Sequence, residues 1–163
     1  MLSALGVILI YVGSLIEVVD ISMAVIASML TVFAVIEYGK GAPWMVFFAT
    51  SALACIFAPP WSGFGGTLYY VAFFGFYPIL KEYFERMSKV KAWICKEIVF
   101  NVCLAVIIVL LKLVFFAQVS VPVPMYVMLV LLCEAVFVLY DVALTRLITF
   151  YIYRLRDRLR FKK

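Results

Sequence analysis

The C-terminal apolar run constrains this sequence more than any other feature. From Met125 to Tyr153 the residues are almost entirely apolar, yet Glu134, Asp141 and Arg146 lie among them. A run of this length can cross a bilayer as one helix. Because a charge in lipid hydrocarbon costs about 2.5 to 3.5 kcal/mol even on lenient scales, these side chains must face protein, an opposite charge or water. We therefore expect a membrane helix inside a bundle, with Glu134 and Asp141 two turns apart on one face.

The composition of the whole chain agrees with this expectation. Of its 163 residues 68% are hydrophobic and 14% are charged, and the mean hydropathy is +1.18. Soluble domains contain roughly 45 to 50% apolar residues. The four cysteines lie in apolar runs without C-x-x-C spacing, and there is no histidine, so we expect no disulfide, metal site or cofactor.

Six apolar segments predict the fold class, an all-α integral membrane protein built as a compact bundle of six transmembrane helices. Residues 1–153 form this single domain, and 154–163 form a basic tail. Gly75 and Pro78 are expected to kink the fourth helix. The expected spans are 2–16, 21–36, 43–58, 67–83, 93–116 and 124–150.

The distribution of basic residues sets the expected orientation. If both termini are cytoplasmic, every Lys and Arg except Lys112 lies at the inner side, as the positive-inside rule requires. The basic tail is then expected to contact anionic membrane lipids rather than nucleic acid.

Two charges near the outer end form the candidate ligand site. Lys112 and Glu134 differ in expected depth by roughly 9 Å at about 1.5 Å rise per residue, a gap that two long side chains can largely close. With Trp61 in the preceding outer loop, they predict a polar spot in an outward cavity that binds a ligand. The alternative is a structural tie between adjacent helices.

A second polar group is expected nearer the cytoplasm, as a structural network within the membrane. Its expected role is to hold two helices in register, and the alternative is a coupling point to a cytoplasmic partner. Its members are Asp141, Arg146, Asn101, Glu97 and Lys96.

Enzymatic activity is not expected. The sequence contains no histidine, no G-x-S-x-G, no H-E-x-x-H and no phosphate loop. Glu134 and Asp141 are too far apart along one helix to act as one acid–base pair.

The layout resembles the substrate-binding (S) subunits of energy-coupling-factor importers. The resemblance lies in six short spans, a glycine-bounded second connection and the Pro- and Gly-rich segment Pro59–Gly66. It implies a bacterial inner-membrane protein that captures a vitamin-like micronutrient, with a membrane coupling subunit and ATPases as separate chains. The pairs Ala24/Ser28 and Ala27/Thr31 are the nearest candidates for the docking patch of that family.

Two further resemblances leave an alternative open. The string Phe73–Lys81 resembles uncharacterised small six-helix membrane proteins of Gram-positive bacteria, which implies no activity. The size and hydropathy are also similar to those of the membrane subunit of the rod-shape-determining machinery, which would make the chain a scaffold. An outward cavity containing Glu134 would favour capture, whereas Glu134 packed against Lys112 without a cavity would favour scaffolding.

Overall fold

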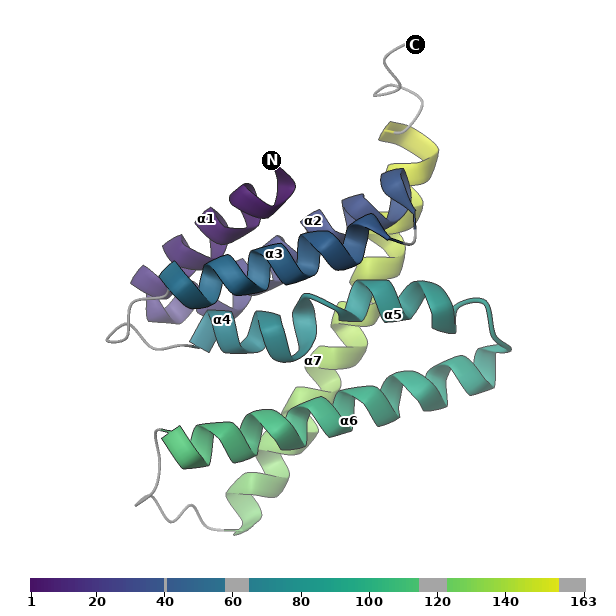
Figure 1. Cartoon of the computed structure of the whole chain (residues 1–163). Helices are drawn as coiled ribbons and strands as arrows, with labels where there is room; N and C mark the ends of the chain where they lie inside the picture. Colours follow the sequence, from purple (N-terminus) through teal and green to yellow (C-terminus); the bar gives the residue numbers. More distant parts are fainter. Residues whose placement is uncertain (40, 58–64, 115–122, 156–163) are drawn as a thin grey trace, which may run out of the picture. The chain divides into compact units, whose positions relative to one another are not determined.

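The computed structural model describes residues 1–39, 41–57, 65–114 and 123–155, and within these ranges the regular elements are all helical (Figure 1). The chain divides into two compact units, Met1–Phe115 and Phe116–Lys163. The helices of the first unit are α1 (Leu2–Leu15), α2 (Asp20–Tyr38), α3 (Ala42–Phe57), α4 (Gly65–Tyr69), α5 (Tyr77–Phe84) and α6 (Lys89–Val114). The second unit contains α7 (Val123–Phe150).

Three of these helices are long and apolar enough to cross a membrane. They are α2, the part of α6 from Lys89 to Leu110, and the segment from Val127 to Tyr153, which comprises most of α7 and the residues just after it. α1 and α3 are apolar but have only 14 and 16 residues. At about 1.5 Å per residue both are shorter than the roughly 30 Å hydrocarbon core.

The fourth apolar segment is discontinuous, whereas the sequence predicts one kinked helix over 67–83. α4 is followed by a π-helical turn, η2 (Tyr70–Phe74), in which the N–H of Gly75 donates to the carbonyl of Tyr70 over 2.7 Å. The N–H groups of Ile79 and Leu80 both donate to the carbonyl of Phe76, at 3.0 and 3.2 Å. Pro78, which has no N–H, lies within this first turn of α5, so the helix restarts there instead of continuing.

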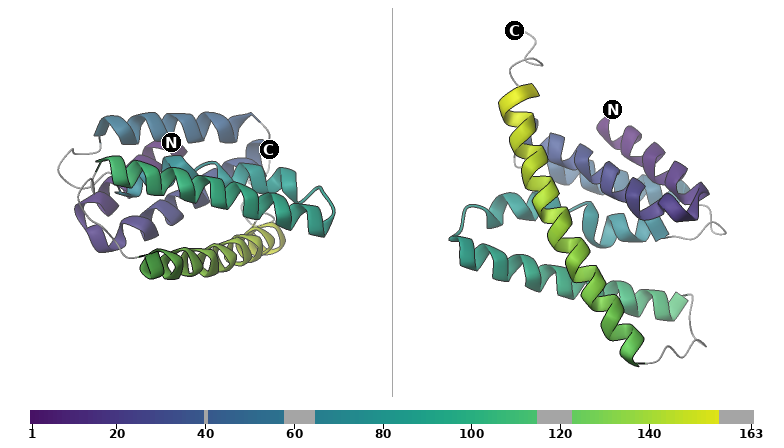
Figure 2. Two further views of the ribbon diagram at one scale, coloured as in Figure 1. Left: turned by 90° about the horizontal axis from the view of Figure 1, so that it is seen from below. Right: turned by 180° about the vertical axis from the view of Figure 1, so that it is seen from behind.

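α2 is the central helix of the first unit, because α1, α3, α4, η2 and α5 all contact it (Figure 2). Small residues allow this close approach. Ala24, Ala27, Ser28 and Thr31 are at most 1% exposed and pack within the unit. The expectation that these four residues form a docking patch is therefore wrong, since neighbouring helices already cover them.

Aromatic side chains fill the space where the fourth segment is interrupted. The ring of Phe47 on α3 lies against Gly75, where a Cβ atom would come within 2.6 Å of it. The same ring lies 6.2 Å from that of Tyr70 and 6.0 Å from that of Phe76, centroid to centroid. On α6, Phe100 packs edge-on against Phe73 at 5.4 Å. Between membrane helices such rings stabilise the packing through van der Waals contact.

In the second unit, α7 runs into a π-helical turn, η3 (Tyr151–Leu155). The hydroxyl of Thr145 donates to the carbonyl of Asp141 at 2.9 Å, and that of Thr149 donates to the carbonyl of Thr145 at 2.8 Å. These bonds satisfy two hydroxyls inside an apolar helix. Asp141, Thr145 and Thr149 are spaced by four residues, so they form a polar line along one face of α7.

Candidate functional site

The first polar cluster lies where α1 ends and α2 begins. Asp20, in the first turn of α2, is 9% exposed, and its carboxylate accepts a hydrogen bond from the backbone N–H of Gly66 in α4. The first N–H groups of any helix lack partners within the helix. Asp20 therefore caps α4 from a different helix, which fixes where the fourth segment begins.

Glycines surround this carboxylate, and their lack of side chains makes room for it. A Cβ atom on Gly65 or Gly66 would overlap the oxygens of Asp20, and one on Gly13 would lie 3.5 Å from Oδ1. We call Asp20 with Gly13, Gly65 and Gly66 the Asp20 cradle. Because it joins α1, α2 and α4, the cradle holds three elements at one end of the unit.

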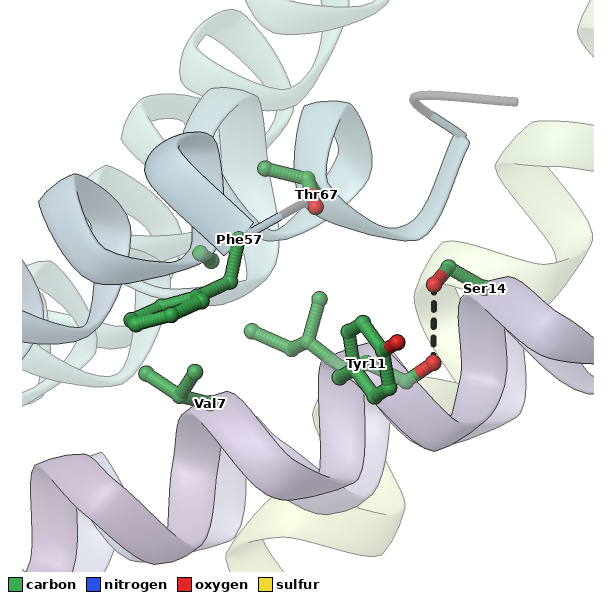
Figure 3. A pocket seen from close by; sticks show the side chains of 7 residues that line it. Val7, Tyr11, Ser14, Phe57 and Thr67 are labelled. Carbon is green, nitrogen blue, oxygen red and sulfur yellow. Dashed lines mark hydrogen bonds between the residues drawn. The ribbon is translucent and has the colours of Figure 1, made fainter. Parts of the chain in front are cut away.

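A small cavity lies beside the cradle, between α1, α3 and α4 (Figure 3). Its volume is about 10 Å³, which is close to the minimum for one water molecule. Tyr11 and Ser14 bring polar atoms from α1, and Thr67 follows the cradle on α4. The hydroxyl of Ser14 donates to the carbonyl of Tyr11 at 2.7 Å. The apolar lining residues are Val7, Ile10, Ala54 and Phe57.

A buried tyrosine joins three segments deeper in the unit. The hydroxyl of Tyr70 lies 3.2 Å from Thr31 Oγ1 on α2 and also hydrogen-bonds the side chain of Thr50 on α3. Tyr70 and Thr50 are each 1% exposed and Thr31 is 0% exposed. A buried hydroxyl without a partner is costly, so this triad specifies how α2, α3 and η2 meet.

The second polar cluster lies between α5 and α6. The carboxylate of Glu85, which is 44% exposed, forms ion pairs with two lysines. Its Oε1 atom lies 3.1 Å from Nζ of Lys81 and 3.8 Å from Nζ of Lys96. Both lysine side chains are buried, at 1% and 7% exposed. Lys96 also lies 5.6 Å from the centre of the Trp93 ring. One carboxylate thus ties the end of α5 to the first turns of α6.

Of the three expected ligand-site residues, the structure describes Lys112 and Glu134. Trp61 lies outside the described residues. Lys112 is an exposed residue in the last turn of α6, and Glu134 lies on α7 in the second unit. Their pairing around a ligand therefore stays a prediction.

The expected network nearer the cytoplasm has three members in the first unit, Lys96, Glu97 and Asn101. Asn101 donates to Glu97 at 3.1 Å, but to the backbone carbonyl rather than the carboxylate. Lys96 is joined to Glu85, which the prediction did not include. Asp141 and Arg146 lie on α7, so their part in the network stays a prediction.

Sequence reasoning did not predict the contact between Asp20 and the start of α4. It assigns no contact to Asp20 and places Gly66 in the Pro- and Gly-rich segment Pro59–Gly66, but Gly65 and Gly66 begin α4. The available signal is a Gly-Gly pair followed directly by an apolar run, which matches a helix start that another backbone or side chain approaches closely. Nothing in the sequence pairs that start with Asp20.

No protein-family model, curated protein or solved structure matches this chain.

Proposed function

We propose that the chain crosses a bacterial inner membrane six times, with both termini in the cytoplasm. Three helices have sufficient length, and α1, α3 and the discontinuous α4–α5 segment supply further apolar elements. The basic residues support the orientation, since Lys112 is then the only Lys or Arg at the outer side. In this orientation the Asp20 cradle and its cavity lie toward the outside, and Glu85 lies toward the cytoplasm.

The function of the chain is to capture a small polar molecule for a multi-subunit importer whose ATPases are separate chains. The observation that supports this role is the small cavity lined in part by Tyr11, Ser14 and Thr67, of which Ser14 and Thr67 directly follow Gly13 and Gly66 of the Asp20 cradle in the chain. Binding sites of many transporters lie beside discontinuous helices, and α4 belongs to such a segment.

The ligand class follows from the chemistry of the cradle. A carboxylate that accepts the Gly66 N–H can accept an N–H or O–H of a ligand instead. This favours a cationic or hydroxyl-rich molecule. A typical ligand pocket measures about 300 to 1,000 Å³, so binding requires the cavity to widen. Displacing α4 from Asp20 would widen it, because Thr67 forms one wall.

Native mass spectrometry of the full-length protein, extracted gently from its own membrane, tests this function. The expected result is a co-purified small molecule whose occupancy falls at least tenfold in Asp20→Asn. The control Glu82→Gln changes an exposed ion pair between α5 and Arg86 and should keep the molecule. A protein that carries no small molecule, with unchanged uptake in Asp20→Asn cells, would overturn the capture function.

A membrane scaffold is the second candidate, and the Tyr70 triad favours it. Buried hydroxyls that bond one another across three segments specify a fixed arrangement, which is what an assembly platform needs. Cross-linking in intact cells separates the two functions. A scaffold gives a stable protein partner and no ligand-dependent change, whereas a capture subunit gives a coupling partner whose cross-link yield depends on ligand.

A further inference from the structure

An exposed apolar stripe runs along α6 from its first turn. Val90, Ile94 and Ile98 are 71, 54 and 58% exposed, and their spacing of four residues places them on one face. α6 begins at Lys89, and the segment from Lys89 to Leu110 is apolar enough to cross a membrane. The stripe therefore offers an acyl chain a continuous surface that starts at the membrane boundary.

Two exposed lysines flank the start of this stripe. Lys89 and Lys91 precede and follow Val90, so they lie about 100° to either side of it around the helix. Within the described part of the chain neither makes an ion pair. The nearby carboxylates contact other cations, since Glu82 pairs with Arg86 and Glu85 pairs with Lys81 and Lys96.

An aromatic side chain marks the same level of the membrane. Trp93, one turn beyond Val90, is 41% exposed, and the ammonium group of Lys96 lies 5.6 Å from its ring centre. Tryptophan is enriched at the boundary between headgroups and hydrocarbon. The lysines thus lie at headgroup depth, while Ile94 and Ile98 continue into the hydrocarbon.

We propose that the start of α6 binds an anionic phospholipid, with its headgroup phosphate between Lys89 and Lys91 and an acyl chain along Val90, Ile94 and Ile98. A zwitterionic headgroup carries its own cation, which competes with the lysines for the phosphate. A free phosphate ion gains nothing from the apolar stripe. The site therefore selects anionic lipid over both, and it does so whether the chain captures a ligand or acts as a scaffold.

Trp93 provides a local readout of this site in the full-length protein. The chain has three tryptophans, so Trp44→Phe with Trp61→Phe leaves Trp93 as the only one. This protein is reconstituted into phosphatidylcholine bilayers in which either phosphatidylglycerol or phosphatidylcholine is brominated, and quenching of Trp93 fluorescence is measured. Because quenching requires contact, the signal reports only the lipid that lies against Trp93.

Brominated phosphatidylglycerol is expected to quench Trp93 at a mole fraction at least fivefold lower than brominated phosphatidylcholine does. Lys89→Gln with Lys91→Gln should remove this preference, so that the two lipids quench Trp93 at the same mole fraction. Lys89→Arg with Lys91→Arg should retain it, as should Lys112→Gln at the other end of α6. Added inorganic phosphate at constant ionic strength should not displace the lipid.

Three results would overturn the proposal. The first is equal quenching by the two lipids in the protein with both lysines, and the second is an unchanged preference in the double glutamine variant. Displacement by inorganic phosphate would also contradict it, because it would show a soluble-anion site. The melting temperature of each variant, measured in the same lipid, confirms that the comparison is between folded proteins.

Discussion

The carboxylate of Asp20 on α2 accepts a hydrogen bond from the backbone N–H of Gly66, 46 residues further along the chain. Capping residues usually belong to the helix that they cap. Here the cap comes from another helix, so it fixes the position of α4 as well as its first turn. This contact makes the Asp20 cradle the part of the first unit where sequence changes should have the clearest effects.

Replacing Asp20 by alanine should destabilise the protein by about 1.5 to 3 kcal/mol, because a buried N–H loses a charged acceptor. For a chain of this size each kcal/mol corresponds to about 2 to 4 °C in melting temperature. Thermal unfolding in detergent measures the loss. Asp20→Asn keeps an acceptor oxygen and should lose less than half as much, so equal losses in the two variants would contradict the capping role.

Gly66→Ala should be poorly tolerated, since its methyl group would overlap the Asp20 carboxylate. Such overpacking costs about 1 to 3 kcal/mol. Gly41→Ala is the matched control, because a Cβ atom there meets nothing within 4 Å. The melting temperatures of the two alanine variants should therefore differ by several degrees. If the two variants have the same melting temperature, the close approach of Asp20 does not require a glycine at position 66.

Tyr70→Phe should lower stability by about 1 to 2 kcal/mol, because Thr31 and Thr50 each lose a buried hydrogen-bond partner. Tyr83→Phe is the control. Its side chain is exposed, and a phenylalanine ring still faces the guanidinium of Arg86, which lies 5.9 Å from the ring centre. Each variant loses one tyrosine hydroxyl, so the difference between their melting temperatures measures what the hydrogen bonds of the Tyr70 triad contribute. An equal loss would mean that the triad adds nothing.

Helix positions were the most predictable part of this structure. Apolar runs ended by charged or Gly- and Pro-rich residues placed α1, α2 and α3 within a few residues of their observed ends. The break after η2 was signalled by Gly75 and Pro78, though the sequence predicted a kink rather than two helices. Helix ends and breaks depend on residues that are neighbours in the chain, so they can be predicted from a single sequence.

The polar contacts between helices were less predictable. In an apolar chain every helix face is hydrophobic, so periodicity does not show which face meets a neighbour. Asp20 accepts a hydrogen bond from Gly66, and Lys81 is buried against Glu85, but nothing in the sequence predicts either pairing. These pairings depend on helix register, which is set by packing across the whole unit rather than by neighbouring residues.

Glu85→Gln should destabilise the protein by about 1 to 2 kcal/mol, because the buried ammonium groups of Lys81 and Lys96 lose a shared negative charge. The loss is moderate because water partly screens the exposed carboxylate. Glu82→Gln breaks the exposed pair with Arg86 and should change stability by less than about 0.5 kcal/mol. High salt should reduce the loss in Glu85→Gln only in part, because both ammonium groups are buried. A loss that disappears completely at high salt would show that the buried lysines do not depend on Glu85.

Gly75→Ala should destabilise the break in the fourth segment, since the added methyl group would lie 2.6 Å from the Phe47 ring. The expected cost is about 1 to 3 kcal/mol. Phe47→Leu alone removes ring contacts with Tyr70 and Phe76 and should also be destabilising. In the double variant the smaller leucine leaves room for the methyl group. The combined loss should therefore be at least 1 kcal/mol smaller than the sum of the single losses. Thermal unfolding of all four proteins gives this coupling, and additive losses would show that Phe47 does not press on Gly75.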